Sequence, residues 1–133
     1  LWISTAPRLY RLRSNGALDA IGDAQFVRNP WVNTCFEDRE GNLWLGSQTE
    51  SLFRAWDGLV TRLTEADGLV DPFVWALEGD GQGGVLVGTN SGLSQWRDGR
   101  VETLVPGGAL PDPSVYELAR LGDDRLWIGT RGG

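Results

Sequence analysis

A short pattern recurs along this chain with a nearly constant period. It consists of three apolar residues, then Gly or Ser, then Thr or Ser, and its copies begin at Leu1, Leu43, Val85 and Leu126. These starts are 42, 42 and 41 residues apart. A second marker keeps the same register at intervals of 42 and 41 residues: Val32, Val74 and Val115. Two independent markers with one period indicate a chain built from similar stacked units.

The internal pattern of the units predicts strands. We divide the chain into units of approximately 1–28, 29–69, 70–110 and 111–133. A complete unit holds four short apolar or alternating runs, such as 59–63, separated by Gly, Asp and Asn, which is typical of strands and tight turns. With 19 glycines and no sustained helical periodicity, the chain is predicted to be all-β. Four strands in a period of about 40 to 45 residues indicate a β-propeller blade.

The stretch "EDREGNLWLGS" at 37–47 predicts one turn and one buried strand. Asp38 and Gly41 suit a tight turn between the first and second strands of a blade. Trp44 then lies in a strand that neighbouring blades cover on both faces, so we expect it in the core. The glycines that follow, Gly46, Gly88 and Gly129, are expected to end their strands where the backbone bends.

The strand count predicts a partial propeller. The chain starts on the second strand of a blade and gives three strands, then two blades of four, then two more strands. Thirteen strands make about three and a quarter blades, fewer than the ~4 to 8 blades of a closed ring. We therefore expect an arc whose partners are the remaining blades of a larger propeller, or other copies of this chain.

The same residues resemble the two-component regulator propeller repeat. The match is close in "VNTCFEDREGNLWLGS" at 32–47 and in "LWIGTRGG" at 126–133, while "VLVGTNSGL" at 85–93 lacks the Trp. The resemblance implies a ring of about twice this length or more. It also implies the extracytoplasmic, periplasmic input domain of a bacterial membrane-bound histidine kinase, hybrid sensor or diguanylate cyclase, which binds a signal and relays it to an output domain.

Composition excludes several other functions. The formal charge of -6 argues against nucleic acid, because a phosphate backbone selects a basic surface. No apolar run reaches the ~20 residues of a membrane helix, so we expect no direct membrane contact from this segment. The chain has no His, which removes the commonest general base and metal ligand. We predict no cofactor, no metal and no catalytic residue, and expect the single cysteine, Cys35, to pack rather than react.

Candidate binding residues gather at one edge of the predicted blades. In an antiparallel blade, the start of the first strand and the end of the second lie at the same edge. Aromatic rings beside carboxylates and amides suit a sugar or another small polar ligand, through stacking and directed hydrogen bonds. The predicted ligand-binding residues are Trp31, Asn33, Gln48, Glu50, Asp71, Phe73, Trp75, Asn90, Asp112, Tyr116 and Arg131, with Ser91 beside them.

Other interpretations stay open at this point. Trp75 and Tyr116 occupy equivalent positions, so they also fit a role in packing between blades, and Asp71 and Asp112 precede prolines and suit turn initiation. The chain is also compatible with a protein-interaction scaffold that binds no small molecule. A third alternative is a hydrolase or lyase in which Glu50, Asp71 or Asp112 act as acid and base.

Overall fold

The computed structural model describes residues 2–5, 8–20, 31–57, 59–122 and 125–133, and these form an all-β structure. The described strands are β1 (Trp2–Thr5), β2 (Arg8–Leu12), β3 (Leu18–Ala20), β4 (Val32–Glu37), β5 (Leu43–Ser47), β6 (Leu52–Trp56), β7 (Leu59–Leu63), β8 (Val74–Gly79), β9 (Val85–Thr89), β10 (Gly92–Arg97), β11 (Arg100–Pro106), β12 (Val115–Arg120) and β13 (Leu126–Thr130). Two short 3-10 helices, η1 (Glu65–Asp67) and η2 (Gly107–Ala109), join successive sheets. The all-β prediction is confirmed.

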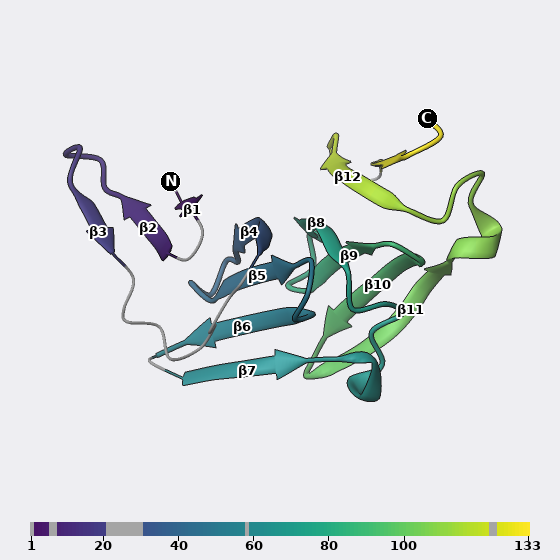
Figure 1. The fold of residues 1–133 in the computed structure, drawn as a ribbon, viewed down its shortest axis with the longest axis horizontal. Helices are drawn as coiled ribbons and strands as arrows, with labels where there is room; N and C mark the ends of the chain where they lie inside the picture. Colours follow the sequence, from purple (N-terminus) through teal and green to yellow (C-terminus); the bar gives the residue numbers. More distant parts are fainter. Residues whose placement is uncertain (1, 6–7, 21–30, 58, 123–124) are drawn as a thin grey trace.

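The strands form four antiparallel sheets that follow one another along the chain. Strands β4 to β7 make one four-stranded sheet and β8 to β11 make the next, each in sequence order. Within the described residues, β1 to β3 form a three-stranded sheet and β12 and β13 a two-stranded sheet. Figure 1 shows the two complete sheets side by side, with the incomplete ones at either end. The predicted sequence of three, four, four and two strands is confirmed.

The first-to-second strand turn forms around one carboxylate, as the sequence predicts. Asp38 Oδ1 accepts the backbone N–H groups of Glu40 and Asn42, while Oδ2 accepts the indole N–H of Trp44 at 2.8 Å. Gly41 adopts the left-handed φ of 82° that closes the turn. Burial acts to raise the pKa of Asp38, but hydrogen bonds from Trp44 and Asn42 outweigh it, so the pKa is lowered.

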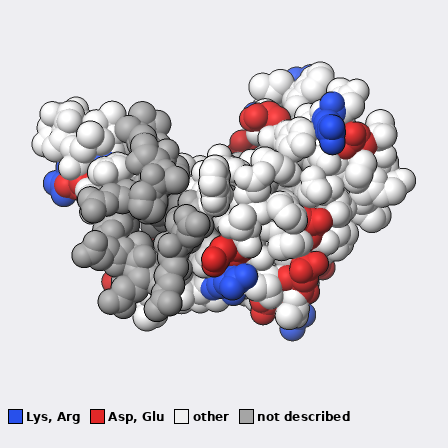
Figure 2. All heavy atoms as spheres, in the orientation of Figure 1, with Lys and Arg blue, Asp and Glu red and all other residues white. Residues whose placement is uncertain are grey.

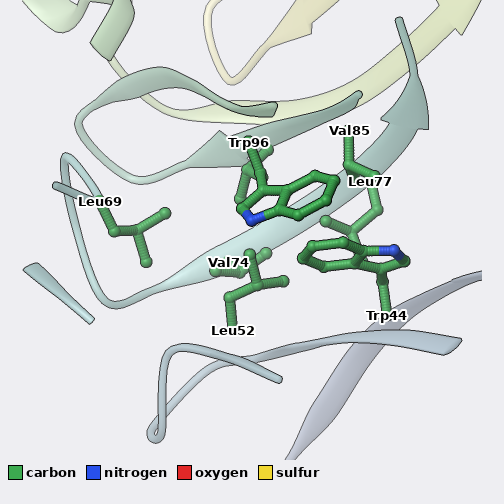
Figure 3. Close-up of a cluster of buried hydrophobic side chains, with 8 residues drawn as sticks. Trp44, Leu52, Leu69, Val74, Leu77, Val85 and Trp96 are labelled. Atoms are coloured by element: carbon green, nitrogen blue, oxygen red, sulfur yellow. The ribbon is translucent and has the colours of Figure 1, made fainter. Parts of the chain in front are cut away.

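Trp44 fills the space between the two complete blades. It is fully buried, and its ring centroid lies 4.8 Å from that of Trp96 in the next blade. Figure 3 shows the two indoles among Val74, Val85, Leu77 and Leu69. The second strand β5 is buried along its whole length, which confirms that Trp44 belongs to the core.

The prediction that the repeated glycines end their strands was wrong. Gly46 lies inside β5, Gly88 inside β9 and Gly129 inside β13, and each strand continues for one residue past its glycine. A Cβ atom on Gly46 would lie 2.5 Å from Val74 Cγ1, and one on Gly88 would lie 2.8 Å from Val115 Cγ1. The glycines are therefore needed because the first-strand valine of the next blade packs against the backbone at this position.

Candidate functional site at the inner-strand rim

The predicted edge forms in the same way in three blades. The backbone N–H of Gln48 donates to the carbonyl of Trp31, that of Asn90 to Phe73, and that of Arg131 to Ser114. These bonds join the end of each second strand to the residue just before the first strand of the same blade. We call this edge the inner-strand rim: the residues before and at the start of β4, β8 and β12, and those after β5, β9 and β13.

Each first strand carries a β-bulge at the rim. Val32 pairs with Ser47 and Thr34 with Gly46, so one residue of β4 has no partner. The same irregularity falls between Val74 and Ala76 in β8 and between Val115 and Glu117 in β12. The extra residues are Asn33, Trp75 and Tyr116. A bulge changes the direction of a side chain, and bulges are common next to functional sites.

The bulge residues contact the neighbouring blade. Asn33 Nδ2 donates to the carbonyl of Val74 at 3.0 Å. The rings of Trp75 and Tyr116 meet edge to face, with centroids 4.9 Å apart and planes at 84°. The indole nitrogen of Trp75 is buried without a hydrogen-bond partner among the described residues. The packing interpretation of Trp75 and Tyr116 is thus confirmed, although Tyr116 remains 38% exposed.

Two predicted carboxylates hold their own loops. Asp71 Oδ1 accepts the backbone N–H of Phe73 at 2.8 Å, and Asp112 Oδ1 accepts that of Ser114 at 2.9 Å. Asp71 Oδ2 also accepts the hydroxyl of Ser91 at 2.6 Å. The turn-initiator interpretation is therefore confirmed for both Asp-Pro pairs, and these carboxylates position the rim loops.

The remaining predicted residues differ in exposure. Trp31 is 57% exposed and Phe73 is 41% exposed. Asn90 Oδ1 accepts the hydroxyl of Ser114 across the junction with the next blade, while Arg131 is exposed at the end of β13. Glu50 is half-buried in the turn between β5 and β6, where its carbonyl accepts a hydrogen bond from Arg62. The rim thus combines exposed aromatic rings with amide groups.

Sequence reasoning missed a cleft at the opposite end of the strands. It has a volume of about 370 Å³ and lies among the first-to-second strand turns of three sheets, lined by Phe36, Glu37, Asp38, Arg39, Glu40, Glu78, Gly79, Gly81, Gly83, Gly84, Arg120 and Gly122. Arg39 donates to the carbonyl of Gly81, and Arg120 donates to that of Asp80. The charged groups of this cleft therefore tie neighbouring turns together. The glycine-rich stretch "EGDGQGG" at 78–84 was the available signal for this cleft.

Two further clefts lie away from the rim. Clefts of about 210 and 560 Å³ lie beside Leu104 and beside Ser14. Within the described part of the chain, none of these three clefts is lined by a predicted rim residue. Figure 2 shows acidic and basic side chains scattered on one face of the molecule, often next to each other.

No group of three or more His, Cys, Asp or Glu side chains in the described ranges is placed to hold a metal ion. No helix in that part of the chain is long and apolar enough to cross a membrane.

Comparisons with known proteins agree with this architecture. A family model described as two component regulator propeller matches residues 27–49, which confirms the resemblance seen in the repeat. A search of curated proteins gives no match. The chain is similar to an extracellular domain of B. thetaiotaomicron described as belonging to a hybrid two component system, BT3049, with a TM-score of 0.69 and 18% identity. It is also similar to the extracellular domain of the hybrid two component system BT4673 from the same organism, with a TM-score of 0.73 and 20% identity.

The extent of these matches shows how much of a relative this chain represents. The similarity covers 92% and 97% of this chain but only 19% and 18% of the BT3049 and BT4673 chains. At this identity the likeness shows the fold: an arc of propeller blades.

Proposed function

We propose that this chain is part of the ligand-sensing propeller of a bacterial signal-transduction receptor. It binds a small polar or carbohydrate ligand at the inner-strand rim, and the signal passes to an output domain outside this sequence. The match to the two component regulator propeller model and the similarity to extracellular domains of hybrid two component systems support this role. They also support a position outside the cytoplasmic membrane, which we place in the periplasm.

The observation that carries the proposal is the exposure of aromatic rings at the rim. Trp31 and Phe73 occupy equivalent positions, each one residue before the first-strand valine, and both expose large apolar surfaces. Exposed apolar surface bordered by polar groups is typical of ligand-binding grooves and interaction sites. A sugar ring stacks on such a face, while nearby amides supply hydrogen bonds to its hydroxyl groups.

The proposal makes the chain a binding module rather than an enzyme. Two of the three carboxylates considered for acid and base roles, Asp71 and Asp112, already accept hydrogen bonds from the backbone of their own turns. A pair of catalytic carboxylates has to face a substrate at a fixed separation. The rim therefore supports recognition better than hydrolysis or elimination.

One surface favours an additional protein partner. Trp127 in β13 is 60% exposed, although its counterpart in β5, Trp44, is fully buried by the next blade. We propose that another blade covers β13, supplied either by a larger ring or by a second copy of this chain. Size-exclusion chromatography with light scattering separates these two sources, since only the second gives a discrete oligomer above 14.6 kDa.

An oligosaccharide array tests the sensing proposal. The fluorescently labelled chain is applied to an array of neutral and acidic oligosaccharides, alongside the Trp31→Ala and Phe73→Ala variants. Leu59→Ala is the control, because Leu59 is 60% exposed but lies on the outer strand β7. We expect binding by the chain and by the control, with loss in both rim variants. Equal binding by all four proteins would contradict a site at the rim.

A further inference from the structure

We infer that the bulge residue of each first strand, Asn33, Trp75 and Tyr116, selects which ligand the rim accepts. This inference rests on the proposed function and concerns the same rim. It assigns specificity to one defined position per blade, and it identifies the preferred ligand as a neutral, hydroxyl-rich molecule rather than an acidic or cationic one.

The first argument is the contrast between the bulge position and the residues around it. The residue before each bulge is always valine, and in β8 and β12 this valine is fully buried against the glycine of the preceding blade. The bulge residue itself changes from an amide to an indole to a phenol. Because the valine and the glycine hold the blades together in the same way each time, the side-chain chemistry that differs from blade to blade at this edge lies at the bulge position.

The second argument is placement. Asn33 reaches the backbone of Val74, and Trp75 touches Tyr116, so each bulge side chain lies at a junction between blades. Asn33 is exposed and Tyr116 is 38% exposed. Trp31 and Phe73, whose rings are exposed, precede Asn33 and Trp75 by two residues and lie just before the same strands. The bulge side chains and these rings therefore follow one another along the rim, and we call them the row.

The third argument is an unsatisfied donor. The indole N–H of Trp75 is buried and has no acceptor among the described residues. A buried donor without a partner is costly and calls for an explanation. A hydroxyl oxygen of a ligand that reaches this nitrogen would provide the missing acceptor.

Charge decides the ligand class. Asn33, Trp75 and Tyr116 carry no formal charge at neutral pH, and the nearby carboxylates of Asp71 and Asp112 are already engaged by their own turns. Uncharged donors and acceptors beside aromatic rings favour hydroxyl groups and the apolar face of a neutral sugar. An acidic ligand would require an excess of cations at the rim; the bulge residues supply none, and among the predicted rim residues Arg131 alone is basic, while Glu50, Asp71 and Asp112 are acidic.

Exchanging the bulge residues tests the inference. The variants Asn33→Trp, Trp75→Asn and Tyr116→Phe are compared with the parent chain on the array of neutral and acidic oligosaccharides. Phe73→Leu is the matched control, because Phe73 lies on the same rim but outside the bulge. Thermal unfolding followed by circular dichroism identifies variants that do not fold. We expect Asn33→Trp to fold even if the other variants do not, because Asn33 is exposed.

We expect the parent chain to bind neutral oligosaccharides on the array. In the parent chain, one neutral oligosaccharide gives the strongest binding signal and another the second strongest. Each bulge variant should change the ratio of these two signals by about tenfold or more, which is a modest effect for one altered contact. Phe73→Leu should weaken all signals together. An unchanged ratio in the folded bulge variants, or a preference for acidic oligosaccharides, would overturn the inference while leaving rim binding intact. If the folded parent chain binds nothing, the proposed function and the inference both fail.

Discussion

Val74 in β8 occupies the space that a side chain on Gly46 in β5 would need. A Cβ atom at position 46 would lie 2.5 Å from Val74 Cγ1 and 2.6 Å from Thr34 Cγ2. The same relationship joins Gly88 to Val115 one unit later. The repeated glycine and the repeated valine, which look independent in the sequence, are thus the two halves of one contact between blades.

Gly46→Ala should therefore destabilise the chain. Overpacking of this kind typically costs about 1 to 3 kcal/mol, because either Val74 or the strand backbone must move. Urea unfolding followed by tryptophan fluorescence measures the change. Gly108→Ala is the control, since nothing lies within 4 Å of a Cβ atom there. Equal stability of the Gly46 variant and the parent would contradict this account of blade packing.

Arg54 should contribute to stability through three indole rings. Its guanidinium carbon lies 4.6 Å from the ring centroid of Trp96, 4.8 Å from that of Trp56 and 5.4 Å from that of Trp44. Partly desolvated contacts of this kind are worth about 2 kcal/mol. We expect Arg54→Ala to lower the free energy of unfolding by roughly that amount and to shift tryptophan emission to longer wavelength.

The matched control for this prediction is Arg100→Ala, since Arg100 is exposed at the start of β11. If the free energy of unfolding falls equally in the two arginine variants, the contacts between the Arg54 guanidinium and the indole rings do not stabilise the fold.

Two turn carboxylates should make stability depend on pH. The pKa values of Asp38 and Asp80 are lowered from the ordinary 3.8, since hydrogen bonds from Trp44 and Arg97 respectively outweigh the effect of burial. A lowered folded-state pKa gives stability that is complete above the unfolded pKa and is lost as pH falls through the folded pKa. We expect the free energy of unfolding to decrease below about pH 4.

The variant Asp38→Asn/Asp80→Asn checks this assignment. It should be less stable than the parent at neutral pH and should lose less stability on acidification. Glu102→Gln is the control because Glu102 is exposed on β11. An unchanged pH profile in the double variant would show that other groups cause the acid sensitivity.

Cys35 should react slowly with thiol reagents. It packs beside the cluster of Leu43, Leu45 and Phe53, and burial raises the pKa of its thiol. The thiolate is the reactive form, so both effects lower the rate. Labelling with a chromogenic disulfide at pH 8 should become faster by at least about tenfold in urea, reflecting both exposure and the return of the pKa to its ordinary value. A rate that is already fast in the folded chain would contradict the packing role.

Much of the blade could be predicted because it depends on residues close together in the sequence. The turn formed by Asp38 and Gly41, and the burial of Trp44 just after it, follow from local turn chemistry and strand patterning. The Asp-Pro turns at 71–72 and 112–113 form for the same reason. The spacing of Val32, Val74 and Val115 also placed the first strands correctly.

The features that sequence reasoning missed all depend on contacts between blades. The role of Gly46 is visible only once Val74 is placed against it. The bulges at Asn33, Trp75 and Tyr116 are properties of strand pairing, which spacing along one strand does not reveal. The contact of Arg54 with Trp96 and the turn cleft beside Gly79 likewise join residues about one repeat apart. A period identifies equivalent residues, but not which side chains meet across the junction.

Hydrogen–deuterium exchange with and without the strongest-binding oligosaccharide tests the central claim most directly, because it locates a ligand on the chain. Peptides that carry the rim amides of Gln48, Asn90 and Arg131 should become protected. Peptides across the opposite turns, which include Asn42 and Gly84, should exchange as before. Protection confined to those turns would place the ligand in the cleft beside Gly79 and contradict recognition at the rim.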